Sequence, residues 1–110
     1  KMVATGNNHT CVLGLNNKIY CWGFNTYGNT GQASTGHIGD NKNISVSNTF
    51  VNIDSEFSQI SGGVNHSCAL EKDKGEIICW GHNNFGQLGI ASTETIGDDE
   101  LPTQFVQLQE

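Results

Sequence analysis

Hydrophobic and polar residues alternate over short segments of this chain, and no segment keeps the 3.6-residue period of an amphipathic helix. Residues 11–15 read Cys-Val-Leu-Gly-Leu and residues 18–22 read Lys-Ile-Tyr-Cys-Trp, with Asn16 and Asn17 between them. Alternation, β-branched and aromatic residues and a short polar connection together predict two strands of a β-hairpin.

A second hairpin with the same pattern is predicted at residues 67–70 and 76–80, where Gly75 can supply the positive φ that tight turns favour. Shorter apolar segments predict one further strand before and one after each hairpin: residues 3–4, 50–53, 60–61 and 105–108. Each half of the chain therefore has about four predicted strands.

The two halves are copies of one repeat. Motif residues of the first half recur 57 or 58 residues later: His9, Cys11, Cys21, Trp22, Gly23 and Asn25 match His66, Cys68, Cys79, Trp80, Gly81 and Asn83. Four-stranded units at this spacing are typical of β-propellers, so we predict an all-β chain with two four-stranded blades, residues 1–56 and 57–110. Two blades cannot close a ring, which we expect to be completed by further repeats or by oligomerisation. For an independent chain we favour a cyclic homotrimer.

Three segments resemble the regulator of chromosome condensation repeat family: Gly6-x-x-His9-Thr10-Cys11, Tyr20-Cys21-Trp22-Gly23-x-Asn25-x-x-Gly28 and Cys79-Trp80-Gly81-x-Asn83-x-x-Gly86-Gln87-Leu88-Gly89. The resemblance covers both copies and implies the family's propeller fold. The first copy departs from it at Asn29-Thr30, where the second has Gln87-Leu88. The paired cysteines resemble the bacterial, exported branch of the family. Family members serve as an exchange factor, a light sensor and an enzyme inhibitor, so the resemblance implies the fold more than the function.

The four cysteines fall on adjacent strands of the predicted hairpins, so disulfides Cys11–Cys21 and Cys68–Cys79 are within reach. One alternative is a zinc site formed by His9, Cys11 and Cys21, although it lacks a fourth ligand and a Cys-x-x-Cys knuckle. The other alternative is free buried thiols. The even count and the repeated placement favour disulfides, and therefore an oxidising compartment.

The repeated motif residues are expected to be structural. A cysteine nucleophile with His9 as its base is an alternative, but its duplication beside a second cysteine favours a structural role. We expect hydrogen-bonded core histidines, tryptophans between blades with the indole N–H satisfied locally, and glycines at positive φ in Trp-Gly-x-Asn turns: His9, His66, Trp22, Trp80, Gly23, Gly81, Asn25 and Asn83.

Composition excludes several classes of partner. Lys plus Arg number 5 against 11 for Asp plus Glu, giving a net charge of −6, and the basic residues do not cluster. Nucleic acid and anionic membranes would be repelled, and no apolar run approaches the roughly 18 residues of a membrane span. We expect no cofactor. Loop acids Asp40, Asp98, Asp99 and Glu100 miss the spacing of a calcium loop, which favours solvated carboxylates and leaves calcium open. The start at Lys1 indicates a processed or excised piece.

The resemblance also implies a ligand surface. In the family, the two residues between the glycine and histidine of each blade tend to face the ligand, and the matching positions are Asn7, Asn8, Val64 and Asn65. Amides donate and accept hydrogen bonds, which suits a glycan. We therefore predict a binding or adhesion module, not an enzyme, that is extracellular, cell-surface or periplasmic and recognises a surface glycan or another surface ligand.

Three alternatives remain open at this point. One is a protein-binding inhibitor or receptor, similar to the exported β-lactamase inhibitory propeller, which would use the aromatic residues Phe24, Tyr27 and Phe85 as anchors. Another is a fragment of a larger scaffold of the same repeats. An enzyme would need paired carboxylates or a metal on the assembled face.

Overall fold

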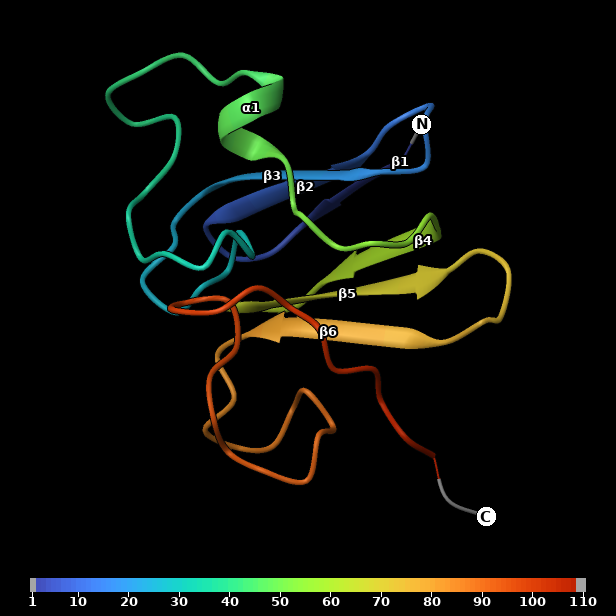
Figure 1. Cartoon of the computed structure of the whole chain (residues 1–110). Coiled ribbons are helices and arrows are strands. Elements are labelled where there is room, and N and C mark those ends of the chain that lie inside the picture. The colour runs from blue at the N-terminus through green and yellow to red at the C-terminus, as the bar shows by residue number, and fades with distance from the viewer. Residues whose placement is uncertain (1, 109–110) are drawn as a thin grey trace.

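The chain folds into two antiparallel three-stranded sheets stacked on one another. The computed structural model describes residues 2–108, so residue 1 of the first predicted blade and residues 109–110 of the second lie outside it. The sheets are β1 (Met2–Thr5), β2 (His9–Leu13) and β3 (Ile19–Gly23), then β4 (Phe57–Gly62), β5 (His66–Glu71) and β6 (Ile77–Gly81). Figure 1 shows the first sheet above the second. The predicted all-β architecture of two repeated units is confirmed.

The strand register brings the cysteines of each repeat face to face. Cys11 pairs with Cys21 across β2 and β3, and Cys68 pairs with Cys79 across β5 and β6. Each pair forms a disulfide with its Cα atoms 4.1 Å apart, as predicted. Because all four cysteines are in disulfides, the zinc site and the free or nucleophilic thiols are excluded.

The first hairpin is shorter than its alternating pattern predicts. Strand β2 ends at Leu13, and Leu15 lies in the turn with 87% of its surface exposed. The chain reverses at Asn17, which has a φ of 64°, so Leu15 leaves the sheet before it can join the buried face. In the second hairpin the predicted positive φ at Gly75 is confirmed, at 72°.

The predicted outer strands are reduced to single bridges. Phe50 bridges to Tyr20 and Phe105 to Ile78. The next residue of each segment adds one backbone hydrogen bond, from Val51 N to the carbonyl of Ile19 and from Val106 N to that of Ile77, but no continuous strand forms. Before Phe50 lies the four-residue helix α1 (Val46–Thr49), which the sequence pattern did not indicate. Ser45 caps this helix by accepting a hydrogen bond from the backbone N of Asn48.

The hydrophobic core lies between the two sheets. Leu13 and Ile19 of the first repeat and Phe57, Ile78 and Trp80 of the second are at most 1% exposed. Burial of side chains of this size stabilises the fold by about 1.5–3 kcal/mol each. Among residues 2–108, no helix has the length and apolar character needed to cross a membrane.

Candidate functional site

The four predicted ligand-binding residues lie together at one end of both sheets. Asn7 and Asn8 form the turn between β1 and β2, and Val64 and Asn65 form the turn between β4 and β5. The backbone N of Asn7 donates to the carbonyl of Val64 at 3.1 Å, which joins the two turns. Asn7, Asn8 and Val64 are exposed and Asn65 is half-buried. We call this end of the sheets the loop edge, because the long loops after β3 and β6 also start there (Figure 1).

Each turn holds the start of the following long loop. The carbonyl of Asn8 accepts from the backbone N of Phe24 at 2.9 Å, and the carbonyl of Asn65 accepts from that of His82 at 2.9 Å. Phe24 and His82 are equivalent residues, since each follows a Trp-Gly pair. An aromatic or imidazole ring is therefore fixed beside each amide-rich turn.

These rings continue into a row that crosses from one repeat to the other. His37 stacks on Phe24 with ring centroids 5.1 Å apart, Phe24 lies 6.1 Å from Tyr27, and Tyr27 stacks on His82 at 4.0 Å. We call these four residues the ring row. Phe24 and Tyr27 are among the aromatic residues that the sequence offers as anchors, whereas His37 and His82 are not predicted from it. The position of His82 directly after Trp80-Gly81 is a signal that could identify it.

Of the two motif histidines, His9 is a hydrogen-bonded core residue, as expected, whereas its equivalent His66 is only half-buried. His9 is 3% exposed, and its Nε2 lies 2.8 Å from the hydroxyl of Ser67. That hydroxyl donates to the carbonyl of Asn29, so His9 Nε2–H is the donor to Ser67. Burial lowers the pKa of His9, and the nearby His66 lowers it further, while burial lowers the pKa of His66. Both rings are therefore neutral at physiological pH.

The two motif tryptophans differ in burial. Trp80 lies between the sheets as expected, fully buried, but its indole N–H is not satisfied locally: it donates to the carbonyl of Asn29 in the other repeat at 3.1 Å. Trp22 is only half-buried, because no repeat packs on its face of the first sheet. The expectation that Trp22 lies between two blades is not met within this chain.

The motif asparagines and glycines shape the loops, as predicted. Asn25 and Asn83 are fully buried, and each donates from Nδ2 to two backbone carbonyls of its own loop. Each also accepts at Oδ1 from a backbone N five residues further along. Gly23 and Gly81 have φ values of 110° and 112°, which a side chain would strain.

Three loop acids have carboxylate oxygens within 4.8 Å of one another: Asp98, Asp99 and Glu100. Burial raises the pKa of Glu100, and the neighbouring carboxylates raise it further, against a hydrogen bond from the backbone N of Gly97 at 2.8 Å. This cluster is the one candidate cation site among residues 2–108, and its spacing alone does not identify a ligand.

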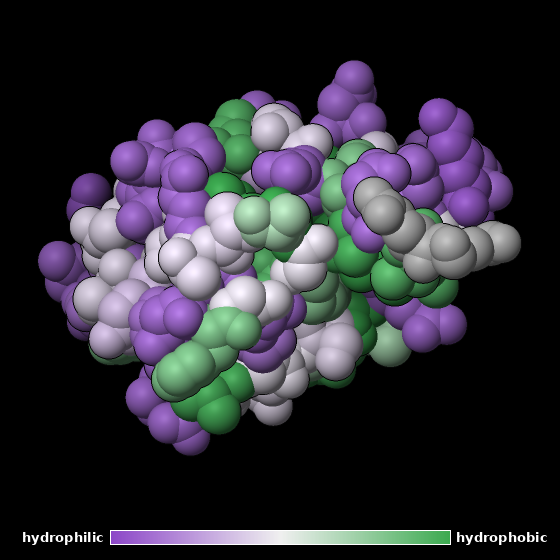
Figure 2. Space-filling model, turned by 90° about the horizontal axis from the view of Figure 1, so that it is seen from below, coloured by the Kyte–Doolittle hydropathy of each residue, from purple (hydrophilic) through white to green (hydrophobic). Residues whose placement is uncertain are grey.

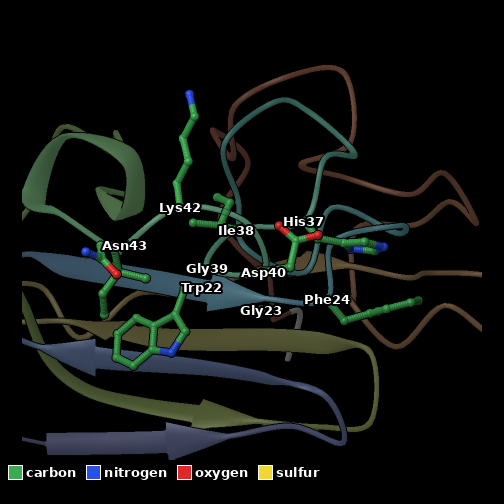
Figure 3. Close-up of a pocket in the computed structure, with 10 residues that line it drawn as sticks. Trp22, Gly23, Phe24, His37, Ile38, Gly39, Asp40, Lys42 and Asn43 are labelled. Atoms are coloured by element: carbon green, nitrogen blue, oxygen red, sulfur yellow. The ribbon is translucent and has the colours of Figure 1, made fainter.

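An open hollow of about 590 Å³ lies between β3 and the loop that follows it. Figure 3 shows Trp22 and Asn43 toward one end, Phe24 and His37 toward the other, and Lys42 extending away from the strand. The hollow is lined by residues 22–24, 37–40 and 42–44. It therefore adjoins the ring row through Phe24 and His37.

Comparison with known proteins matches both halves of the chain to the same repeat family. Models of the Regulator of chromosome condensation (RCC1) repeat match residues 3–29 and 57–87, and residues 74–110. The Ultraviolet-B receptor UVR8 of Arabidopsis thaliana is 37% identical over 92 residues, which cover 83% of this chain and 19% of the receptor. The X-linked retinitis pigmentosa GTPase regulator of Canis lupus familiaris is 34% identical, with 87% of this chain and 9% of the regulator covered.

Two solved structures have the same fold over most of the chain. Human WBSCR16 matches with a TM-score of 0.67 and 28% identity, covering 92% of this chain and 24% of that one. Prp20p of Saccharomyces cerevisiae matches with a TM-score of 0.69 and 21% identity, covering 98% of this chain and 25% of Prp20p. The chain thus spans about a quarter or less of each of these four proteins.

Proposed function

Because the chain belongs to the Regulator of chromosome condensation (RCC1) repeat family, we propose that it forms two blades of a β-propeller whose loop edge binds a protein partner. The ring row carries this proposal. Aromatic side chains held in place by backbone hydrogen bonds are favourable anchors for a protein interface, because they bury a large area at a small entropic cost.

The surroundings of the ring row also favour a protein partner. The exposed amides of Asn7 and Asn8 and the apolar Val64 lie in the turns that hold the row, so the loop edge combines hydrogen-bonding groups with hydrophobic surface. Such a mixture is typical of protein interfaces. The solved structure of Prp20p is described together with its binding to Gsp1p and histones. Its 21% identity supports the shared fold, and the partner of the present chain is proposed from its own loop edge.

Glycan recognition is a second candidate, favoured by one observation. The exposed residues Asn7 and Asn8 stand side by side in one turn, and their uncharged amides can each donate and accept a hydrogen bond. Stacked aromatic rings next to such amides also suit a sugar ring. We rank this function second because hydrophobic Val64 lies at the same edge, 63% exposed.

We further propose an oxidising location, which is the extracellular space, the cell surface or the periplasm. Two disulfides in a chain of 110 residues support this location, because such bonds do not persist in a reducing cytosol. The ring of blades would be completed by further repeats or by copies of the chain, with a cyclic homotrimer as the form expected for an independent chain.

The test compares capture of proteins by immobilised, oxidised chains. Wild type and the variants Tyr27→Ala and Leu15→Ala are incubated with the extracellular protein fraction of the chain's own organism, and bound proteins are identified by mass spectrometry. We expect a partner that binds wild type and Leu15→Ala equally and Tyr27→Ala at least about tenfold more weakly. Leu15 is a matched control because it is exposed and lies at the opposite end of the strands.

A glycan array probed with wild type and Asn7→Ala/Asn8→Ala runs in parallel. A glycan signal that depends on the two asparagines, without a captured protein, would replace the first proposal with the second. If neither protein nor glycan distinguishes the variants from wild type, the loop edge is not a binding surface.

A further inference from the structure

The contacts between the two repeats show how a further repeat would pack on the two outer sheet faces. At this junction the fully buried ring of Trp80 lies on Gly31, where an added Cβ would be 2.9 Å from the indole nitrogen. The same nitrogen donates to the carbonyl of Asn29. We call the outer face of sheet β1-β2-β3 the leading flank and the outer face of sheet β4-β5-β6 the trailing flank.

Each open flank carries one half of this junction. Trp22, the equivalent of Trp80, lies half-buried on the leading flank, paired with Thr10 across the sheet. On the trailing flank, Gly89 is the equivalent of Gly31. Gly31 is buried under Trp80, whereas Gly89 is exposed and an added Cβ would meet Val106 alone. The place of a tryptophan ring is therefore open at Gly89, next to a hollow of about 430 Å³.

The polar contacts of the junction have equivalents as well. His9 donates to Ser67 inside the chain, and the corresponding pair is His66 on the trailing flank and Thr10 on the leading flank. Threonine keeps the hydroxyl that accepts from the imidazole. His66 and Thr10 are half-buried, whereas His9 and Ser67 are at most 3% exposed.

The stacked rings at the junction also have equivalents on the two open flanks. Tyr27 stacks on His82 across the junction, and their equivalents are Phe85 and Phe24. Phe85 is 86% exposed, which is costly for a phenyl ring in water. A neighbour that presents Phe24 would cover it. Figure 2, which views the molecule from below Figure 1, shows hydrophobic surface between hydrophilic side chains on this side.

The hollow beside Trp22 has a filled counterpart at the junction. Around Trp80, the equivalent space holds the turn at residues 27–31, which comes so close that a Cβ on Gly28 would lie 2.4 Å from the backbone of Gly97. The corresponding turn of the second repeat is residues 85–89, and Gly86 in it has nothing within 4 Å of an added Cβ. The hollow in Figure 3 holds Trp22 and Gly39, the equivalents of Trp80 and Gly97, and Ile44 of the same loop borders it, 3.2 Å from a Cβ added at Gly39. A turn seated there would pack against Ile44 as well as Trp22.

We propose that the chain associates head to tail with a second copy of itself, the turn at residues 85–89 of one copy seated against Trp22 and Phe24 of the next. This proposal rests on the propeller arrangement of the proposed function and specifies the junction. Because the two surfaces differ, each copy keeps one flank open for another copy, which permits a closed ring.

One residue sets the strength of this contact. At the internal junction the carbonyl of Thr5 lies so close to Gly62 that a Cβ on Gly62 would be 2.5 Å from its oxygen. In the contact between copies, Thr5 takes the place of Gly62 and its side chain meets the backbone of the neighbouring copy. The association is therefore weaker than the internal junction, and Thr5→Gly relieves the crowding.

Sedimentation velocity of the oxidised 110-residue chain over about 1 μM to 1 mM tests the proposal. We expect reversible assembly by wild type, association about tenfold tighter for Thr5→Gly, and at least tenfold weaker for Trp22→Ala and for Phe85→Glu. Leu15→Ala should assemble as wild type does, since it removes an equally exposed apolar side chain away from both flanks. Near-UV circular dichroism checks that every variant is folded.

A mixing experiment identifies the two complementary surfaces. Trp22→Ala alone and Phe85→Glu alone should remain monomeric, but their equimolar mixture should form a one-to-one dimer through the two intact flanks. A chain that is monomeric both as wild type and as Thr5→Gly overturns the proposal, as does a mixture that stays monomeric. Tyr27→Ala removes a ring that contacts Phe24, so its self-association is measured in the same series. Lost partner capture with unchanged assembly separates the loop-edge function from the contact between copies.

Discussion

The indole N–H of Trp80 donates to the backbone carbonyl of Asn29, 3.1 Å away in the other repeat. The hydroxyl of Ser67 donates to the same oxygen at 3.3 Å, and His9 contacts that hydroxyl. One carbonyl of the first repeat thus receives two side chains of the second. The contact between the sheets therefore combines an apolar core with this polar cluster near the loop edge, and the hydrogen bonds fix the position of one repeat on the other.

The two tryptophans provide a matched comparison of stability. Trp80→Ala should lower the free energy of unfolding by about 3–5 kcal/mol, because it empties the core between the sheets. Trp22→Ala should lower it by no more than about 1 kcal/mol in the monomer, because Trp22 faces the open leading flank. Urea denaturation at a concentration where the chain is monomeric measures both values. Equal losses would mean that Trp22 is as important to the isolated fold as Trp80.

The sequence predicted the features that depend on local pattern and on the repeat. Alternation located the four hairpin strands, and short apolar segments located β1 and β4. The predicted hairpins led to both disulfides, because Cys11 and Cys21 are directly opposite across two adjacent strands. Leu15 was placed wrongly because the apolar alternation continues past the point where Asn17 turns the chain. Helix α1 depends on the cap that Ser45 provides within a polar loop, which hydrophobic periodicity does not report.

The candidate site was predictable only in part. The motif positions located the two turns at Asn7 and Val64, which the structure joins by a backbone hydrogen bond. The ring row could not be read from the chain, because Tyr27 and His82 are 55 residues apart and come together only when the sheets stack. The partial exposure of Trp22 likewise could not be predicted, because it depends on whether another repeat packs on the leading flank.

The two disulfides should differ in their resistance to reduction. Cys11 and Cys21 face the core and are at most 3% exposed, whereas Cys68 is half-buried beneath the open trailing flank. A reductant reaches a sulfur only when it is accessible, so Cys68–Cys79 should be reduced first by limited dithiothreitol. Alkylation followed by peptide mass spectrometry gives the order, and preferential reduction of Cys11–Cys21 would contradict it.

Each disulfide should also contribute to stability. The two disulfides close loops with sequence separations of 10 and 11. Replacing either cysteine pair by alanine should therefore lower the free energy of unfolding, measured by urea denaturation, by about 2–3 kcal/mol. The two double variants are controls for each other, since the loops are nearly equal in length. A loss confined to one pair would show that native packing, rather than the constraint on the unfolded chain, sets the contribution.

Asn83 should be essential for the loop after β6. It is fully buried, donates to the carbonyls of Ser92 and Glu94, and accepts from the backbone N of Leu88. Asn83→Ala leaves these groups without their partner and should lower the free energy of unfolding by about 2–3 kcal/mol. The adjacent, exposed Asn84 gives the control Asn84→Ala, which should be within about 0.5 kcal/mol of wild type.

The neutral state of His9 makes stability dependent on pH. Burial and the nearby His66 lower the pKa of His9 below its ordinary value of 6.5, and burial lowers that of His66. Below about pH 6.5 the unfolded chain therefore binds protons that the folded chain does not, so stability is complete above that pH and falls between it and the lowered pKa values. The urea midpoint should fall between pH 7.5 and pH 5, and the fall should be smaller in His9→Gln, where the amide can still donate to Ser67 but cannot titrate. An unchanged midpoint across this range in the wild type would mean that both histidines keep their ordinary pKa on folding.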